Sequence, residues 1–173
     1  HERGGAGAGS AGAVEAARLS EAPAALSGGG RDPRGRGRPS ALELCATQHR
    51  EFDNTPPPEV VGTLRLTAAR MEQVRRLLGE RVISVSSGYR CRALNRAVSG
   101  AKTSAHLTGH AVDFNCYGFG DPLALCRALA NSSLAFDQVI EEGSWVHISF
   151  DPRLRRQVLT RREGGGYGLG LPE

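Results

Sequence analysis

The chain has 173 residues, of which 22 are basic and 18 acidic, giving a formal net charge of +4. This length suits one ordinary domain with a tail and excludes two full domains. No apolar run approaches the roughly 20 residues of a membrane-spanning helix, and the N-terminal residues lack the continuous apolar segment of a signal peptide. The small basic excess is only a weak indication of an anionic partner such as a cell wall or nucleic acid, and the cellular location stays open.

Residues 1–39 are rich in Gly, Ala, Arg, Ser and Pro and have no sustained periodicity. Such a segment cannot bury enough apolar surface to offset the entropy of ordering, so we predict a disordered tail. The Arg-Gly run within it lacks interleaved aromatic residues, which favours a solvated tail over a nucleic-acid-binding one. We expect order to begin near Ser40, which can cap a short helix together with Glu43.

The longest helical pattern follows a turn at residues 53–58. The prolines of this turn suit the start of a helix, and Gly79 suits its end. Arginines and glutamates occupy one face of the pattern, whereas the opposite face is apolar and is predicted to pack on the core. The apolar residues recur at three- and four-residue steps: Val60, Leu64, Ala68, Met71, Val74 and Leu78.

The remainder of the domain, predicted to span residues 40–162, alternates short strands and helices. Asp121 and Pro122 are typical of a capped helix start, and the glycines after residue 163 predict a flexible tail over residues 163–173. The other expected elements are a strand at 81–86, a short helix at 92–98, an extended segment at 111–114, and two strands at 136–141 and 145–150 joined by a tight turn.

The four cysteines do not form a recognisable metal site. None of them belongs to a Cys-x-x-Cys pair, which argues against a zinc site built from cysteine. Four cysteines allow three disulfide pairings, and the sequence cannot choose among them. We interpret them as small, half-buried thiols; they are Cys45, Cys91, Cys116 and Cys126.

Two histidines and one aspartate offer a different ligand set. His106 and Asp113 are separated by six residues that include a glycine, and His147 lies in a predicted strand. Two imidazole nitrogens and one carboxylate oxygen suit zinc and leave its fourth position open, as in catalytic sites. His110 has the spacing of the helical two-histidine zinc motif, but Leu107 replaces the glutamate which that motif requires, so His110 is not expected to be a ligand.

Several longer words occur in a fixed order along the chain, and together they resemble the zinc D-alanyl-D-alanine carboxypeptidase family (peptidase family M15). This family includes phage L-alanyl-D-glutamate endolysins and D-Ala-D-Ala dipeptidases, and its fold is shared by the hedgehog signalling domain. The resemblance covers about Leu42 to Thr160, and within the family the chain is similar to the phage endolysin branch. The words are Ser-Gly-Tyr-Arg at 87–90, Asn95, Ser-x-His-x-x-Gly-x-Ala-x-Asp at 104–113, Phe-Asp-Gln-Val-Ile at 136–140 and Trp-Val-His-Ile-Ser at 145–149.

The resemblance implies a compact α+β fold with a small antiparallel sheet flanked by helices. It implies one Zn²⁺ ion with His106, Asp113 and His147 as its ligands. It also implies hydrolysis of peptide bonds next to D-amino acids in peptidoglycan stem peptides, as a D,D-carboxypeptidase or as an L-Ala-D-Glu endopeptidase. We expect a monomer.

The same comparison implies further roles at the site. Arg90 matches an arginine that contacts the substrate carbonyl or carboxylate, a task for which a planar cationic fork is suited. Ser104 matches a serine that hydrogen-bonds substrate. Many relatives place the general base three residues before the last ligand, where this chain has Ser144. In the branch that the chain resembles most, the base follows the Phe-Asp-Gln word, so we predict Glu142, with Glu141 as the alternative.

Two other functions compete with this interpretation. One is a non-catalytic binding module of the same fold that keeps zinc for structure, and a carboxylate near the open zinc position, such as Glu142, favours the enzyme over it. The other is a nucleic-acid-binding protein, which rests only on the arginine-rich tails and predicts a steep salt dependence of binding.

Overall fold

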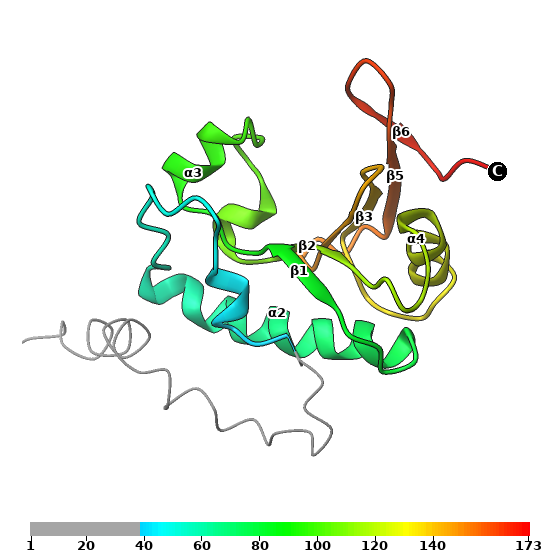
Figure 1. Cartoon of the computed structure of the whole chain (residues 1–173), viewed down its shortest axis with the longest axis horizontal. Coiled ribbons are helices and arrows are strands. Elements are labelled where there is room, and N and C mark those ends of the chain that lie inside the picture. The colour runs from blue at the N-terminus through cyan, green and yellow to red at the C-terminus, as the bar shows by residue number, and fades with distance from the viewer. Residues whose placement is uncertain (1–38) are drawn as a thin grey trace, which may run out of the picture.

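The computed structural model describes residues 39–173, which form an α+β fold built on a six-stranded sheet (Figure 1). The predicted fold class is confirmed, whereas the tail predicted for the N-terminus lies outside the described residues, apart from Pro39. Within residues 39–173 no helix has the length and apolar character needed to cross a membrane. The elements are η1 (Glu43–Cys45), α2 (Pro58–Leu77), β1 (Ser84–Ser87), α3 (Arg92–Ala97), η2 (Ala105–Thr108), β2 (Ala111–Asn115), α4 (Pro122–Ala130), β3 (Gln138–Glu141), β4 (Val146–Ser149), β5 (Gln157–Arg161) and β6 (Tyr167–Leu169).

The strands are arranged in the order β1-β2-β4-β3-β5-β6, and every neighbouring pair is antiparallel except β3 and β5. The predicted antiparallel arrangement therefore describes the sheet with one exception. After β4 the chain crosses back to the beginning of β3, where Arg156 N–H donates to Phe136 C=O and Gln157 N–H donates to Asp137 C=O. Since β5 starts beside the first residues of β3, the two strands run in the same direction.

Asp137 anchors this crossing. Its side chain is fully buried, and its carboxylate accepts hydrogen bonds from the Arg155 backbone N–H and from Nε and Nη2 of the Arg155 guanidinium, at 2.7–3.1 Å. A buried carboxylate needs such partners to offset its lost hydration. The pair therefore connects the antiparallel strands to the two strands that follow the crossing.

Helices α2 and α4 contribute apolar side chains to the core on one face of the sheet. The stripe predicted for α2 is buried or half-buried along its length, and Pro58 opens that helix as expected. Asp121 Oδ1 caps α4 by accepting from Ala124 N–H at 2.8 Å. Along β2 and β4, side chains alternate between the two faces. Val112, Phe114, Val146 and Ile148 join the core, so Asp113 and His147 project from the opposite face.

The last residues of the chain extend the sheet. A flexible tail is expected for residues 163–173, but Tyr167–Leu169 forms β6, which pairs with β5. The physical reason lies in the glycine run 164–166, whose positive φ values build a tight turn that Arg162 N–H closes on Gly166 C=O. Leu171 then packs against the core. We call residues 157–169 the C-terminal hairpin.

Candidate metal centre

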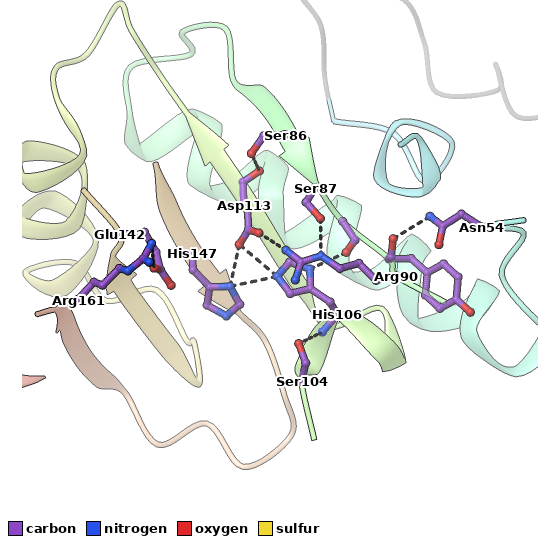
Figure 2. Close-up of polar contacts among 12 residues, drawn as sticks. Asn54, Ser86, Ser87, Arg90, Ser104, His106, Asp113, Glu142, His147 and Arg161 are labelled. Carbon is purple, nitrogen blue, oxygen red and sulfur yellow. Dashed lines mark hydrogen bonds and ion pairs between the residues drawn. The ribbon is translucent and has the colours of Figure 1, made fainter. Parts of the chain in front are cut away.

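Three side chains from distant parts of the chain converge on the face of the sheet opposite the core to which α2 and α4 contribute (Figure 2). His106 Nε2 lies 3.1 Å from Asp113 Oδ1 and 3.2 Å from His147 Nδ1, and His147 Nδ1 lies 2.8 Å from Asp113 Oδ1. The structure thus brings together the three residues that the sequence predicts as ligands. Among the described residues, it is the one group of three His, Cys, Asp or Glu side chains whose donor atoms lie this close together.

His106 is held in place by its surroundings on η2. Its side chain is 2% exposed, and its Nδ1 lies 2.6 Å from the carbonyl oxygen of Gly88. A carbonyl oxygen only accepts hydrogen bonds, so Nδ1 carries the proton and donates it there. Gly109 ends η2 in a left-handed conformation with φ of 74° and turns the chain into β2. The ring therefore presents Nε2 to the centre of the cluster.

Strand register places the other two donors. Asp113 of β2 pairs directly with His147 of β4, so their side chains stand side by side on one face of the sheet. Asp113 is also fixed through its backbone, because its carbonyl oxygen accepts a hydrogen bond from Ser86 Oγ at 3.1 Å. Sequence distance is irrelevant here, since antiparallel pairing brings residues 34 positions apart into contact.

The electrostatics of the cluster favour the protonation states of metal ligands. Burial lowers the pKa of His106 and outweighs the opposing effect of Asp113, so its imidazole is neutral. Burial alone would raise the pKa of Asp113, but His106 and His147 hold that pKa well below its usual value. The set therefore comprises an ionised carboxylate and at least one neutral imidazole.

This donor set fits zinc in chemistry and in spacing. Zinc is bound by histidine nitrogen and carboxylate oxygen at about 2.0–2.2 Å, and tetrahedral geometry then separates two ligand atoms by roughly 3.3 Å. The three donor–donor distances of 2.8–3.2 Å lie close to this value. The hydrogen bond from His106 Nδ1 to Gly88 is the kind of outer contact that fixes the tautomer of a metal-binding histidine.

Arg90 makes a contact that the sequence does not reveal. Its Nη2 forms an ion pair with Asp113 Oδ2, and its Nε donates to Ser87 Oγ at 2.8 Å (Figure 2). The guanidinium therefore holds the carboxylate by the oxygen that faces away from the two histidines. A role of Arg90 in contacting substrate stays a prediction, but its position beside Asp113 places it at the edge of the cluster.

Glu142 and Glu141 point in different directions. Ile140 of β3 pairs with His147, and Glu142 N–H donates to Trp145 C=O just beyond the end of the strand. Because side chains alternate, Glu142 lies on the face of Ile140 and His147 (Figure 2). Glu141 lies on the α4 side, where burial raises the pKa of Cys126 to about 12 and the Glu141 charge contributes.

The remaining predicted site residues are peripheral to the cluster. Ser104 Oγ accepts a hydrogen bond from His106 N–H at 3.4 Å and so caps η2. His110 does not join the cluster, as expected, and its Nδ1 lies 2.9 Å from Thr108 Oγ1. Ser144 is exposed in the turn between β3 and β4, where its backbone carbonyl accepts from Asn115 Nδ2.

A pocket of about 220 Å³ has Arg90 in its lining, and Arg90 in turn contacts Asp113 of the cluster. Hydroxyl and amide groups line it together with the guanidinium, above a partly apolar wall. The lining residues are Ala46, Thr47, Gln48, His49, Ser86, Ser87, Tyr89, Arg90, Leu94 and Val98.

Sequence reasoning missed two residues that contact Glu142. Tyr167 Oη donates to Glu142 Oε1 at 3.1 Å, and Arg161 Nη1 lies 3.9 Å from Glu142 Oε2. Both belong to the C-terminal hairpin, part of which was expected to be a flexible tail. The sequence signal for this hairpin is a short apolar pair, Val158 and Leu159, followed by a glycine turn and Tyr167.

A comparison with protein families gives a match to the model described as Peptidase M15 over residues 39–149. The matched segment contains all three residues of the cluster together with Arg90 and Glu142, and it ends at the last residue of β4. No curated protein matches the sequence.

Proposed function

Because the chain belongs to the peptidase M15 family, a family of zinc-dependent peptidases, we propose that it hydrolyses peptide bonds next to D-amino acids in bacterial peptidoglycan. The proposed ligands of a single zinc ion are His106, Asp113 and His147. The reaction is a D,D-carboxypeptidase or an L-Ala-D-Glu endopeptidase reaction on stem peptides.

One contact carries the metal assignment. His106 Nδ1 donates its proton to Gly88, and a buried neutral imidazole then has only a lone pair at Nε2. This lone pair faces the ionised Asp113 Oδ1 at 3.1 Å, so two acceptors confront each other in a buried place. Such an arrangement is repulsive unless a proton or a metal ion lies between the two atoms, and a proton there would charge an imidazole whose burial disfavours the charged form. A divalent metal ion resolves the conflict and accepts His147 Nδ1 as a third donor.

The chain supplies the groups that a metal-assisted hydrolysis requires. A zinc ion bound here would polarise the scissile carbonyl and lower the pKa of a water molecule. Glu142, on the same face of the sheet, accepts the proton of the attacking water and later delivers it to the leaving amine. Burial raises the pKa of Glu142, which makes it a stronger base than an ordinary carboxylate.

The pocket beside Arg90 is the proposed binding place for the stem peptide. Its hydroxyl and amide groups can hydrogen-bond a peptide backbone, and Arg90, which is part of its lining, connects it to Asp113 of the cluster. Arg90 keeps its guanidinium at this edge, where it can approach a substrate carbonyl or carboxylate while it orients Asp113.

Hydrolysis of defined stem peptides tests the proposal. The purified protein is incubated with zinc and with a muropeptide that ends in D-Ala-D-Ala, and mass spectrometry identifies the products. Release of one D-alanine indicates a D,D-carboxypeptidase, and cleavage between L-Ala and D-Glu indicates the endopeptidase. A chelator should abolish either activity and zinc should restore it. Zinc binding without any cleavage would support the non-catalytic module instead.

A matched pair of substitutions tests the base. Glu142→Gln should lower kcat by about 10²–10⁴-fold, the usual contribution of a general base, while zinc binding is retained. Glu141→Gln changes the neighbouring carboxylate on the opposite face and should leave kcat within roughly twofold of the wild-type value. Equal losses in the two variants would reject the assignment of Glu142.

A further inference from the structure

The Glu142 carboxylate is contacted by residues that lie outside the segment that matches the family. The match ends at residue 149, whereas the two side chains that contact the Glu142 carboxylate come from β5 and β6. Tyr167 Oη donates to Oε1 at 3.1 Å, and Arg161 Nη1 lies 3.9 Å from Oε2. The Glu142 side chain is consequently only 10% exposed, although it stands at the end of a hairpin.

Strand register explains why these three residues meet. In the parallel pair, Glu141 of β3 is opposite Thr160 of β5, so the next residues, Glu142 and Arg161, are neighbours. In the following antiparallel pair, Arg161 is directly opposite Tyr167. The three side chains therefore form a row across the sheet, and the glycine turn at residues 164–166 returns the chain at the length this row requires.

Each oxygen of the Glu142 carboxylate has one protein partner and keeps one position free. One oxygen is hydrogen-bonded by a neutral phenol and the other is faced by a guanidinium, which fixes the plane of the carboxylate. Each carboxylate oxygen has two lone pairs, so both retain a free acceptor position for water. His147 and Asp113 are the charged and titratable groups that face Glu142 from β4 and β2.

We propose that Tyr167 and Arg161 are positioning residues that hold the Glu142 carboxylate in the orientation needed for proton transfer, so that the C-terminal hairpin is part of the active site. This inference rests on the proposed function, in which Glu142 is the general base. The C-terminal hairpin then forms one side of the active site, although it lies outside the segment that matches the family. Tyr167 supplies the direct hydrogen bond at 3.1 Å, and Arg161, whose Nη1 lies 3.9 Å from the carboxylate, supplies the weaker contact.

Tyr167→Phe removes only the hydroxyl group and is the main test. The expected result is a roughly tenfold lower kcat with little change in KM, because a hydrogen bond to a charged group is lost from the base and the peptide pocket lies elsewhere. The acid limb of the kcat profile should move to higher pH, since burial raises the pKa of Glu142 and the Tyr167 hydrogen bond lowers it. Arg161→Gln should act in the same direction but less strongly.

Tyr117→Phe is the matched control, because Tyr117 is 79% exposed in the loop after β2 and is not part of the site. It should leave kcat, KM and the pH profile unchanged. In the Glu142→Gln background, Tyr167→Phe should have no further effect, since the group it positions is gone. An unchanged pH profile in Tyr167→Phe, or an equal loss in the Glu142→Gln background, would overturn the inference.

A second measurement keeps this test separate from that of the proposed function. In metal-free protein labelled with ¹³C at the glutamate carboxyl groups, the Glu142 signal is the one that Glu142→Gln removes. Its titration midpoint should rise in Tyr167→Phe and stay constant in Tyr117→Phe. If no stem peptide is cleaved by the wild type, the proposed function fails, and this midpoint still decides whether the hairpin controls Glu142. A midpoint that does not move rejects the hairpin contact.

Discussion

His147 can be removed from the cluster with the least disturbance of the fold, because its side chain is 12% exposed whereas that of His106 is 2% exposed. Zinc that binds only the folded state, at 100 times its Kd, stabilises the protein by about 2.7 kcal/mol, which raises Tm by roughly 5–11 °C. His147→Ala should abolish most of this shift, as measured by thermal unfolding with and without zinc.

His110→Ala provides the control for this measurement. His110 lies four residues after His106 but pairs with Thr108 instead of joining the cluster. The zinc-dependent shift should therefore persist in His110→Ala at nearly the wild-type size. Loss of the shift in both variants would mean that zinc is held by another set of residues.

Glu142 also sets the pH dependence of the reaction. Burial raises the pKa of this carboxyl above its ordinary value of about 4.3, with Asp113 adding to the rise, while Tyr167, His147 and Arg161 oppose it. A general base acts only when deprotonated, so kcat should fall as pH decreases through a midpoint above 4.3. This is measured on the metal-loaded enzyme over a pH range in which zinc binding is shown to be complete.

The same pKa shift has the opposite sign for stability. The folded state binds this proton more tightly than the unfolded state, so the contribution of Glu142 becomes less favourable as pH rises through the shifted pKa. Metal-free Glu142→Gln should accordingly be no less stable than the wild type at neutral pH. A marked loss of stability in that variant would indicate that the carboxylate is structural.

At the scale of single elements, the turn between η2 and β2 controls how His106 and Asp113 approach each other. Gly109 has φ of 74°, and a Cβ there would lie 2.9 Å from Val60 Cγ1 of α2. Gly109→Ala should thus cost about 1–2 kcal/mol for the left-handed backbone and about 1–3 kcal/mol for overpacking. Chemical denaturation measures this loss, and zinc affinity should decrease with it.

Gly143→Ala separates the two contributions. Gly143 also has a positive φ, of 85°, but a Cβ there would meet no atom within 4 Å. It should therefore cost only the backbone term of about 1–2 kcal/mol. If Gly109→Ala lowered the free energy of unfolding no more than Gly143→Ala does, close packing of α2 against the turn between η2 and β2 would not contribute to stability.

Elements with strong local signals were predicted well from the sequence. The apolar stripe and flanking prolines gave α2, the Asp121-Pro122 pair gave α4, and the alternating segments gave β3 and β4. β5 and β6 were not predicted, because arginines dominate their neighbourhood and three glycines mark the turn, which as composition resembles a loose tail. β5 is stabilised by parallel pairing with β3 and β6 by antiparallel pairing with β5, and the parallel contact joins segments that are distant in the sequence.

At the scale of the whole molecule, the residues of the site also divide into those predictable from sequence motifs and those placed by strand pairing. The three cluster residues could be predicted because a family resemblance covers their motifs, and strand alternation correctly separated Glu142 from Glu141. The contacts of Arg90 with Asp113 and of Tyr167 with Glu142 could not be predicted. They depend on how β1 and β6 are placed relative to β2 and β3, and this register is set by the assembled sheet.

Asp137 joins the two parts of the molecule and makes the whole fold sensitive to acid. Hydrogen bonding by Arg155 lowers the pKa of this buried carboxyl. A carboxyl with a lowered folded pKa contributes stability above its unfolded pKa, about 3.9, and this stability is lost as pH falls through the folded pKa. Asp137→Asn should therefore lower the free energy of unfolding by about 1.5–3 kcal/mol at neutral pH, the value of hydrogen bonds to a charged group.

The pH dependence of that difference identifies its cause. As the pH falls below about 4, the wild type loses the same interaction by protonation, so its stability should approach that of Asp137→Asn. Asp151→Asn is the comparison variant, because Asp151 pairs with the exposed Arg153, a residue that also lies 3.7 Å from Asp137, and such a surface pair contributes at most about 1 kcal/mol. Denaturant unfolding of the three proteins between pH 3 and 7 measures this, with the pH values chosen from the ordinary aspartate pKa of about 3.9. A difference between wild type and Asp137→Asn that stayed constant with pH would assign the loss to packing, and Asp137 would then not connect the C-terminal hairpin to the sheet through its charge.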